Sequence, residues 1–277
     1  MRRKRGVVSK RAHRAADKWE KTLLFLGDAR LRKHLPAAKL LTAGNLQKML
    51  ERWGMVYVKP TRGSQGRGVM RVEQSKVKSA GRVVRRYHYQ LGERRHSFGS
   101  YQALYSSLLK DTKGKVYLVQ KGIHMLKHAG RPFDIRLVVQ RTPRGGWEAT
   151  GTLGRVAHPR KIVTNGSQGG TIYPTAFLLR KYTDTGKRKS MLADMDRLGI
   201  HMAKKMGRSY SGMNELGLDL AIDRRLKPWI IEANTVPDPC PFAVLRDQTM
   251  LRKIVRYAKA YGRTYTLNCK KAKRGKL

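Results

Sequence analysis

The sequence predicts a protein of the α+β class, in which antiparallel sheets pack against helices. Two kinds of pattern support this prediction. Several short segments are rich in alternating or β-branched apolar residues and are separated by turn residues, which is typical of antiparallel strands joined by hairpins. Other segments repeat apolar residues at helical spacing, most clearly residues 189–206, whose core-facing stripe comprises Met191, Met195, Leu198, Met202 and Met206.

The stretch from residue 216 to residue 234 predicts one such hairpin. Residues 216–222 alternate apolar with small or acidic side chains, residues 224–228 supply turn chemistry, and residues 229–234 are again strand-like. The register that gathers the apolar residues on one face pairs Ile222 with Trp229, Leu220 with Ile231 and Leu218 with Ala233. It also places Asp219 opposite Glu232 on the other face, with Asn234 two residues further along.

Asp219, Glu232 and Asn234 would therefore present three oxygen-bearing side chains on one face of the sheet. Hard cations such as Mg²⁺ bind oxygen ligands of this kind and keep coordination positions for phosphate oxygens and water. A half-exposed hairpin whose acids face solvent would show the same pattern. This stretch alone leaves both interpretations open.

The balance of charge is strongly basic. The chain of 277 residues has 61 Lys and Arg against 18 Asp and Glu, which gives a net charge of +43. Residues 1–14 hold seven of these bases and residues 263–277 hold six, so most of the excess lies in the body of the chain. Such a charge predicts a polyanionic partner or environment: a nucleotide, nucleic acid, acidic polymer or anionic surface. Charge alone does not choose among them.

Cys240 and Cys269 match no metal-binding or disulfide framework, so the sequence predicts reduced thiols. No apolar run approaches the ~18 residues of a transmembrane helix. The basic first residues lack the apolar segment of a secretory signal. Together these observations predict a cytoplasmic protein.

A glycine-rich loop lies at residues 61–68, between a strand at residues 55–58 and a second strand that begins near residue 69. Its backbone N–H groups could close over phosphates, and Lys59 and Arg67 add positive charge. It is not a Walker A loop, because no Gly-Lys-Ser/Thr opens a helix. An ordinary mobile hairpin loop is the alternative.

Residues 75–98 interleave basic with aromatic side chains, namely Arg82, Arg85, Arg86, Tyr87, His88, Tyr89, Arg94 and Arg95. Such a pattern can bind single-stranded nucleic acid by charge and stacking. A solvated basic strand and loop is the alternative, and in so basic a chain it is the interpretation that we favour.

The remaining elements follow from the same rules. Helices are predicted at residues 17–26 with Asp17 as N-cap, at residues 43–53 with Thr42 as N-cap, and at residues 98–110 and 242–261. Strands are predicted at residues 116–120, 133–140 and 146–156, and the second of these has Asp134 and Arg136 on one face.

In this order, residues 17 to about 240 resemble the ATP-grasp superfamily, and within it the YheC/YheD-type group of spore-forming bacteria. The resemblance is carried by DKW, LRKHLP, VYVKPTRGSQGRGV, YLVQKGI, GRPFDIRLVVQ, GWEATGTLGRVA, TNGSQGG, and LGLDLAID followed by PWIIEAN. Each phrase is weak alone, and their order and spacing make the set specific.

The resemblance implies the ATP-grasp fold, in which two α+β lobes grip ATP between two antiparallel sheets. The N-terminal lobe, residues 17–118, would carry the glycine-rich lid, and the C-terminal lobe, residues 119–262, would carry the metal hairpin. A basic N-terminal segment at residues 1–16 and a basic C-terminal tail at residues 263–277 would flank them. Because only sixteen residues precede Asp17, the substrate lobe that comes first in most ATP-grasp enzymes would be largely absent.

The resemblance also implies roles for individual residues. Lys18 and Lys59 would contact the phosphates, beneath a lid formed by Gly63, Ser64, Gln65, Gly66, Arg67 and Gly68. The adenine pocket would be lined by Gln120, Lys121 and Ile123, with Lys121 standing where many relatives carry an acid, and Asp134 would contact the ribose. Mg²⁺, or Mn²⁺ in its place, would be held by Asp219, Glu232 and Asn234. The transferred phosphoryl group would meet Arg155, Arg136 and Lys59, assisted by Asn165.

The implied reaction is an ATP- and Mg²⁺-dependent ligation. A carboxylate would be activated as an acyl-phosphate and then attacked by an amine or a similar nucleophile, so the partners would be ATP, an anionic carboxylate substrate and an acceptor. A carboxylate that attacks ATP is an anion approaching an anion, and the metal and fixed cations would offset that repulsion. The alternative function is a non-catalytic ATP-grasp scaffold that binds nucleic acid or another polyanion, with an association with spores implied by the family.

Overall fold

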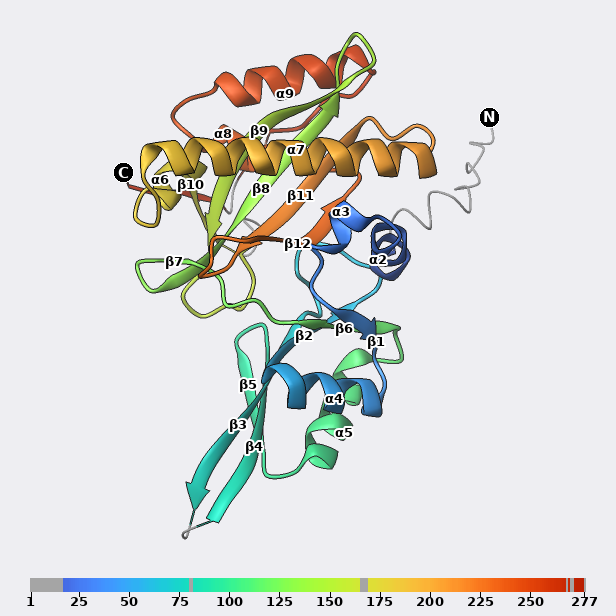
Figure 1. Cartoon of the computed structure of the whole chain (residues 1–277), viewed down its shortest axis with the longest axis vertical. Helices are drawn as coiled ribbons and strands as arrows, with labels where there is room; N and C mark the ends of the chain where they lie inside the picture. Colours follow the sequence, from blue (N-terminus) through green and yellow to red (C-terminus); the bar gives the residue numbers. More distant parts are fainter. Residues whose placement is uncertain (1–16, 80–81, 165–168, 268, 270–271, 277) are drawn as a thin grey trace, which may run out of the picture.

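The computed structural model describes residues 17–79, 82–164, 169–267, 269 and 272–276. Within these ranges the chain forms two largely antiparallel sheets, each packed against helices, which confirms the α+β class (Figure 1). None of the helices in these ranges combines the length and the apolar composition needed to cross a membrane.

The smaller sheet has six strands in the order β1-β6-β2-β3-β4-β5. Their bounds are β1 (Ala38–Leu40), β2 (Met55–Pro60), β3 (Met70–Ser79), β4 (Arg82–Leu91), β5 (Arg94–Phe98) and β6 (Tyr117–Lys121). Helices α4 (Ala43–Trp53) and α5 (Tyr101–Thr112) pack on this sheet, and the side chains of Thr42 and Ser100 cap them. The core beneath the helices includes Tyr87 and Tyr89, which are only 7% and 2% exposed, so these rings do not form a surface for stacking bases.

The larger sheet has seven strands, in the order β12-β11-β8-β9-β10-β13 with β7 paired to β8. Their bounds are β7 (Lys127–His128), β8 (Arg131–Arg141), β9 (Trp147–Val156), β10 (Thr171–Pro174), β11 (Glu215–Ile222), β12 (Pro228–Asn234) and β13 (Lys273–Arg274). Its two faces bury separate cores: on β8, Leu137 and Val139 belong to one core, and Val138 between them belongs to the other.

Helices cover both faces of the larger sheet (Figure 1). Helices α6 (Thr175–Leu179) and α7 (Thr185–Ser209) lie on one face, and α8 (Cys240–Ala243) and α9 (Thr249–Ala260) lie on the other. The stripe of methionines and leucine predicted at residues 189–206 is buried along α7 against the sheet, which confirms it as core.

Helices α2 (Lys18–Leu26) and α3 (Ala29–Arg32) precede the smaller sheet in the chain but pack on the larger one. Asp17 caps α2 as predicted, because its side chain accepts hydrogen bonds from the backbone N–H groups of Trp19 and Glu20. Phe25 and Leu31 lie in the core of the larger sheet. The division into lobes at residue 118 stays a proposal. Under that division, α2 and α3 belong to the N-terminal lobe by sequence but pack on the sheet of the C-terminal lobe.

The predicted hairpin is present, and its register is correct only near the acidic residues. Asp219 pairs with Glu232 and Leu218 with Ala233, as predicted. Beyond Asp219 the register shifts by one residue, so that Leu220 pairs with Ile230 and Ile222 with Pro228. An extra residue in β12 forms a bulge there, which turns the strand locally and leaves the opposition of the two acids intact.

The single helix predicted at residues 242–261 is wrong, because the chain forms α8 and α9 with a break at residues 244–248. The Oδ1 atom of Asp247 accepts a hydrogen bond from the backbone N–H of Thr249, at 2.8 Å. A short acidic side chain that binds the backbone in this way favours the start of a new helix over the continuation of the old one.

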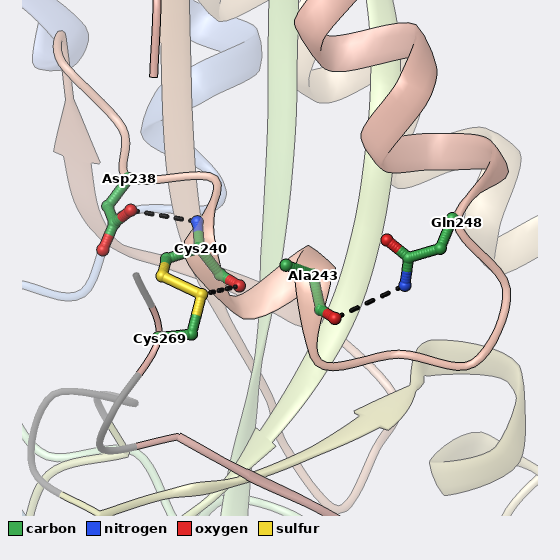
Figure 2. Close-up of a disulfide and its surroundings, with 5 residues drawn as sticks. All are labelled: Asp238, Cys240, Ala243, Gln248 and Cys269. Atoms are coloured by element: carbon green, nitrogen blue, oxygen red, sulfur yellow. Dashed lines mark hydrogen bonds between the residues drawn. A yellow bond between two sulfur atoms is a disulfide. The ribbon is translucent and has the colours of Figure 1, made fainter. Parts of the chain in front are cut away.

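The prediction of reduced cysteines is also wrong. Cys240 and Cys269 form a disulfide with a Cα–Cα distance of 5.5 Å (Figure 2). Asp238 fixes the first partner by accepting a hydrogen bond from the backbone N–H of Cys240, at 2.9 Å. This pairing could not be predicted from the sequence, because a single pair separated by 29 residues resembles no disulfide framework.

Reduction of this disulfide should lower the free energy of unfolding by about 3 kcal/mol, since a cross-link over a loop of this length limits the unfolded chain. Urea unfolding with and without a phosphine reductant measures the change. A Cys240→Ser and Cys269→Ser double variant provides the control, because the reductant should not affect it. Two free thiols titrated in the native, unreduced protein would contradict the prediction.

Candidate functional site

A pocket lies between the two sheets, with walls from β2, β6 and the glycine-rich loop on one side and from β8, β9, β11 and β12 on the other. Thirteen residues singled out from the sequence line it, namely Lys18, Lys59, Gly63, Ser64, Gly66, Arg67, Gln120, Lys121, Ile123, Asp134, Arg155, Asp219 and Glu232. Segments from both ends of the chain therefore meet at one site.

Four predicted residues are absent from the pocket wall, and Asn165 lies outside the described residues. Arg136 lies behind the wall, bonded to Asp219, and Asn234 sits on β12 opposite Gly217. Gly68 has a φ of +72°, and a Cβ there would lie 2.9 Å from the hydroxyl of Tyr117, so this position requires glycine. Gln65 belongs to the same loop, with a φ of +61°.

Lys18 lies in the first turn of α2 and connects the loop to the hairpin. Its Nζ donates a hydrogen bond to the carbonyl of Gly63, at 2.7 Å, and lies 3.4 Å from Oε1 of Glu232. Its backbone N–H donates to the carbonyl of Thr61, at 2.7 Å. The lysine therefore contacts both the glycine-rich loop and an acid of the predicted metal site.

Lys59 closes β2 with its side chain buried, and its Nζ donates to Oε1 of Gln120 at 2.6 Å. Burial lowers the pKa of Lys59 to about 8; the charge of Glu232 partly offsets this, and that of Lys18 adds to it. Lys21 of α2 is similar: burial lowers its pKa to about 8, and its Nζ donates to the carbonyl of Ala233, at 2.5 Å. An anionic ligand in the pocket would favour the protonated form of Lys59, which lines it.

Two arginines and two aspartates form a buried network across the middle of the larger sheet. Register places Asp219 beside Arg136, and Asp134 beside Arg155. Arg136 donates to both carboxylate oxygens of Asp219, at 2.6 and 3.3 Å. Arg155 donates to both oxygens of Asp134, at 2.8 and 2.5 Å, and its Nη2 lies 2.9 Å from Asp219. The four side chains are at most 8% exposed.

The network shifts the pKa values of Asp219 and Arg155. Burial alone would raise the pKa of Asp219, but the guanidinium groups of Arg136 and Arg155 hold it below its usual range. Burial would lower the pKa of Arg155, but Asp134 and Asp219 raise it. The Asp219 carboxyl is therefore ionised and the Arg155 guanidinium protonated at neutral pH.

The donor set fits a divalent cation that is shared with phosphate. Asp219 and Glu232 are directly opposed on neighbouring strands and both line the pocket, and Asn234 follows Glu232 on the same side of β12. No group of three acidic, His or Cys side chains able to hold a metal occurs in the described part of the chain. Mg²⁺ typically takes one or two carboxylates and completes its shell with phosphate oxygens and water. The residues therefore fit such an ion as a partial site.

Positive charge exceeds negative charge around the pocket. Among the described residues that line it, the cations are Lys18, Lys59, Arg67, Lys121 and Arg155, and the acids are Asp134, Asp219 and Glu232. Low-dielectric walls strengthen the field of this surplus, so the pocket favours an anion of high charge.

Part of the pocket wall is apolar and offers a surface for a planar base. Its side chains are those of Tyr57, Ile123, Met125, Ile162 and Ile231. Lys121 lies beside them, with its Nζ 5.2 Å from the ring centre of Trp229 and 6.0 Å from that of Trp53. Its charge thus lies near aromatic rings of helix α4 and of strand β12.

Sequence reasoning missed two polar residues: Thr164, which lines the pocket, and Lys21, which lies one turn after Lys18 and does not line it. Thr164 donates to Oδ2 of Asp134, at 2.7 Å, so the aspartate predicted to contact ribose is already bonded to Thr164 and Arg155. Lys21 was overlooked because it reads as an exposed base on an amphipathic helix. Its spacing of three from Lys18 places both on one side of α2, which was the available signal.

Comparison with known proteins agrees with this geometry. A family described as YheC/D like ATP-grasp matches residues 11–264. Two curated proteins of Bacillus subtilis (strain 168) are similar. Endospore coat-associated protein YheD is 23% identical over 223 residues, which are 80% of this chain and 48% of YheD. Endospore coat-associated protein YheC is 23% identical over 182 residues, 65% of this chain and 48% of YheC. The chain thus spans about half the length of these curated relatives.

Solved structures show the same fold. The biotin carboxylase of Campylobacter jejuni, in a β,γ-ATP complex, is similar with a TM-score of 0.53 and 18% identity, over 93% of this chain and 48% of that one. The biotin carboxylase domain of the Hydrogenobacter thermophilus 2-oxoglutarate carboxylase, solved with MgADP and bicarbonate, gives a TM-score of 0.52 and 15% identity, over 91% and 46% of the two chains. The fold is the ATP-grasp fold.

Proposed function

This chain belongs to the YheC/D like ATP-grasp family, and from this premise we propose that it is an ATP- and Mg²⁺-dependent ligase. The proposed reaction activates a carboxylate as an acyl-phosphate, which an amine or a similar nucleophile then attacks. Because the chain covers about half of its curated relatives, the proposal concerns the reaction that this pocket supports.

The observation that carries the proposal is the convergence of three features on one pocket. Lys18 and Lys59 line the pocket together with a loop that contains several glycines of positive φ, and Asp219 and Glu232 line the same pocket. A triphosphate would satisfy the surplus positive charge, and the apolar side chains of the wall would contact the base. The ATP-grasp fold supports this assignment.

In the first step, a carboxylate oxygen of the substrate would attack the γ-phosphorus of ATP, and the bond to the β,γ-bridging oxygen would break to release ADP. Lys18 and Lys59 would hold the phosphates, while Arg155 would face the phosphoryl group in transfer. Mg²⁺ bound by Asp219, Glu232 and Asn234, or Mn²⁺ in its place, would supply charge neutralisation. In the second step, the nucleophile would attack the acyl carbon, and inorganic phosphate would leave.

The glycine-rich loop would protect the intermediate. Gly63 and Gly66, with φ of +129° and +70°, adopt conformations that few other residues reach, so the loop can follow a phosphate closely with its backbone. A closed loop would exclude water, which would otherwise hydrolyse an acyl-phosphate.

Binding of ATP tests the proposal directly. We expect calorimetry at pH 7 to detect ATP binding that requires Mg²⁺, and the absence of such binding would rule the ligase out. Affinity should then fall as the pH rises through about 8, by up to about tenfold per pH unit, because burial lowers the pKa of Lys59 to about 8 and the triphosphate needs its protonated form.

The Lys59→Arg variant is the matched control for this pH dependence. Arginine keeps its charge throughout the range, so the fall in affinity should be smaller in the variant. Lys21 is unchanged in both proteins, so the difference between the two profiles reports Lys59 alone. Identical profiles would show that Lys59 does not contact the phosphates.

We also propose an association with spores, because both curated relatives carry the name endospore coat-associated protein. The disulfide between Cys240 and Cys269 supports an oxidising location over the reducing cytoplasm expected from the sequence.

A further inference from the structure

The outer half of the hairpin formed by β3 and β4 projects beyond the rest of the smaller sheet (Figure 1). The strands pair from Met70 with Leu91 at the base to Ser79 with Arg82 near the tip. The inner half is anchored by Val72, Tyr87 and Tyr89 in the core. We call the outer half, residues 75–79 and 82–86, the basic arm. None of its residues lines the ATP pocket.

The basic arm carries five cations and no acid among its described residues, namely Lys76, Lys78, Arg82, Arg85 and Arg86, and all five are exposed. One of them, Arg85, has an acidic neighbour elsewhere, with 3.7 Å between its Nη1 and Oε1 of Glu51. Lys76 and Arg85 are directly opposite each other in the ribbon. Like charges in that position destabilise a strand pair, and a two-stranded ribbon in water is marginal to begin with. Such a local conflict is expected where the surface serves a ligand.

The cations occupy both faces of the ribbon. The register places Lys76, Lys78 and Arg85 on one face, and Arg82 and Arg86 on the other. A partner that satisfies both sets has to surround the ribbon. A flat anionic surface would meet only one face or the tip.

Duplex nucleic acid has the required shape. Its major groove, about 12 Å wide, admits a two-stranded β-ribbon, and phosphates line the groove on both sides. Single strands are less suitable, because the aromatic side chains that could stack on bases, Tyr87 and Tyr89, lie in the core. We infer that the basic arm binds duplex nucleic acid by entering its major groove, with lysines and arginines on both faces contacting the two phosphate backbones. Such contacts position a protein without reading sequence.

The test compares two variants that lose the same charge. The arm variant replaces Lys76, Lys78, Arg82 and Arg86 by glutamine and leaves the pair of Arg85 with Glu51 in place. The control variant replaces four exposed cations of α7 by glutamine, namely Lys187, Lys189, Lys204 and Arg208. The two variants have the same net charge. A difference in their affinity for DNA therefore reports the basic arm and not the basic composition of the chain.

Fluorescence anisotropy with a short, labelled, mixed-sequence DNA duplex would measure binding between about 50 and 200 mM salt. We expect the arm variant to bind at least about 30-fold more weakly than the wild type, and the slope of log affinity against log salt to fall by about three to four. The control variant should stay within about threefold of the wild type.

Three results would overturn the inference. Equal losses in the two variants would mean diffuse attraction to the whole surface. Preference for a single strand of the same sequence would exclude the groove. Arm-dependent binding to vesicles of equal parts phosphatidylglycerol and phosphatidylcholine, without duplex binding, would make the arm a membrane contact. Circular dichroism and MgATP binding of the arm variant should match the wild type, so failure here would leave the proposed ligase untouched.

Discussion

Replacement of Glu232 by glutamine is expected to reduce Mg²⁺-dependent ATP turnover by at least about 100-fold, since even the outer partners of a metal site contribute 10–100-fold. Glutamine has nearly the same shape but no charge to offer a cation. Glu232 lies opposite Asp219 at the pocket wall, on the edge strand β12. Because no further strand of the described chain lies beyond β12 in this sheet, none supplies a substitute carboxylate there. Release of ADP in the presence of candidate carboxylates and amines measures turnover. Binding of Mn²⁺ beside a non-hydrolysable ATP analogue, followed by electron paramagnetic resonance, should weaken in parallel.

Glu20→Gln is the matched control, because Glu20 is an exposed glutamate of α2 that does not line the pocket. Its turnover and Mn²⁺ binding should equal those of the wild type. Wild-type turnover in the Glu232 variant would show that this carboxylate does not hold the metal, and the proposed site would be wrong.

Replacement of Asp219 by asparagine should destabilise the protein by about 3–5 kcal/mol, because removal of one partner from a buried ion pair leaves the other charge uncompensated. Two guanidinium groups, those of Arg136 and Arg155, donate to this carboxylate. Asparagine preserves the volume, so the loss is electrostatic. In thermal unfolding the midpoint should fall by roughly 10 °C.

Asp194→Asn provides the comparison for Asp219. Asp194 also pairs with an arginine, Arg197, but the two side chains are 58% and 68% exposed. Exposed pairs of this kind contribute less than about 1 kcal/mol, so the midpoint should hardly change. If the two variants unfolded at the same temperature, the buried network would contribute no more than a surface pair.

Much of the fold could be predicted because local signals and tertiary packing agree. The helix at residues 43–53 has its predicted bounds, since Thr42 supplies a cap and Leu46 and Met49 supply an apolar side. The opposition of Asp219 and Glu232 followed from alternation alone. A resemblance spread over the chain then placed Lys18 and Lys59, which no local rule would have brought to the same pocket.

What could not be predicted depends on contacts between distant segments. The alternation of apolar and polar residues along β11 does not reveal the bulge after Asp219. Beyond that residue the predicted pairing of the two strands is therefore wrong. The sequence groups Tyr87 and Tyr89 with the basic residues around them, as a candidate surface for stacking bases. In the structure helices α4 and α5 bury both rings. The pairing of Arg155 with Asp219 spans two strands of the sheet, and only the strand order β11-β8-β9 brings it about.

The position of Lys18 has a consequence for how the two halves of the molecule communicate. One amino group contacts the loop of the smaller sheet at Gly63 and the acid of the larger sheet at Glu232. A phosphate that binds this ammonium group would compete with the Glu232 carboxylate for it. The carboxylate would then become available to a cation, so nucleotide capture would favour metal loading without any rearrangement of the sheets.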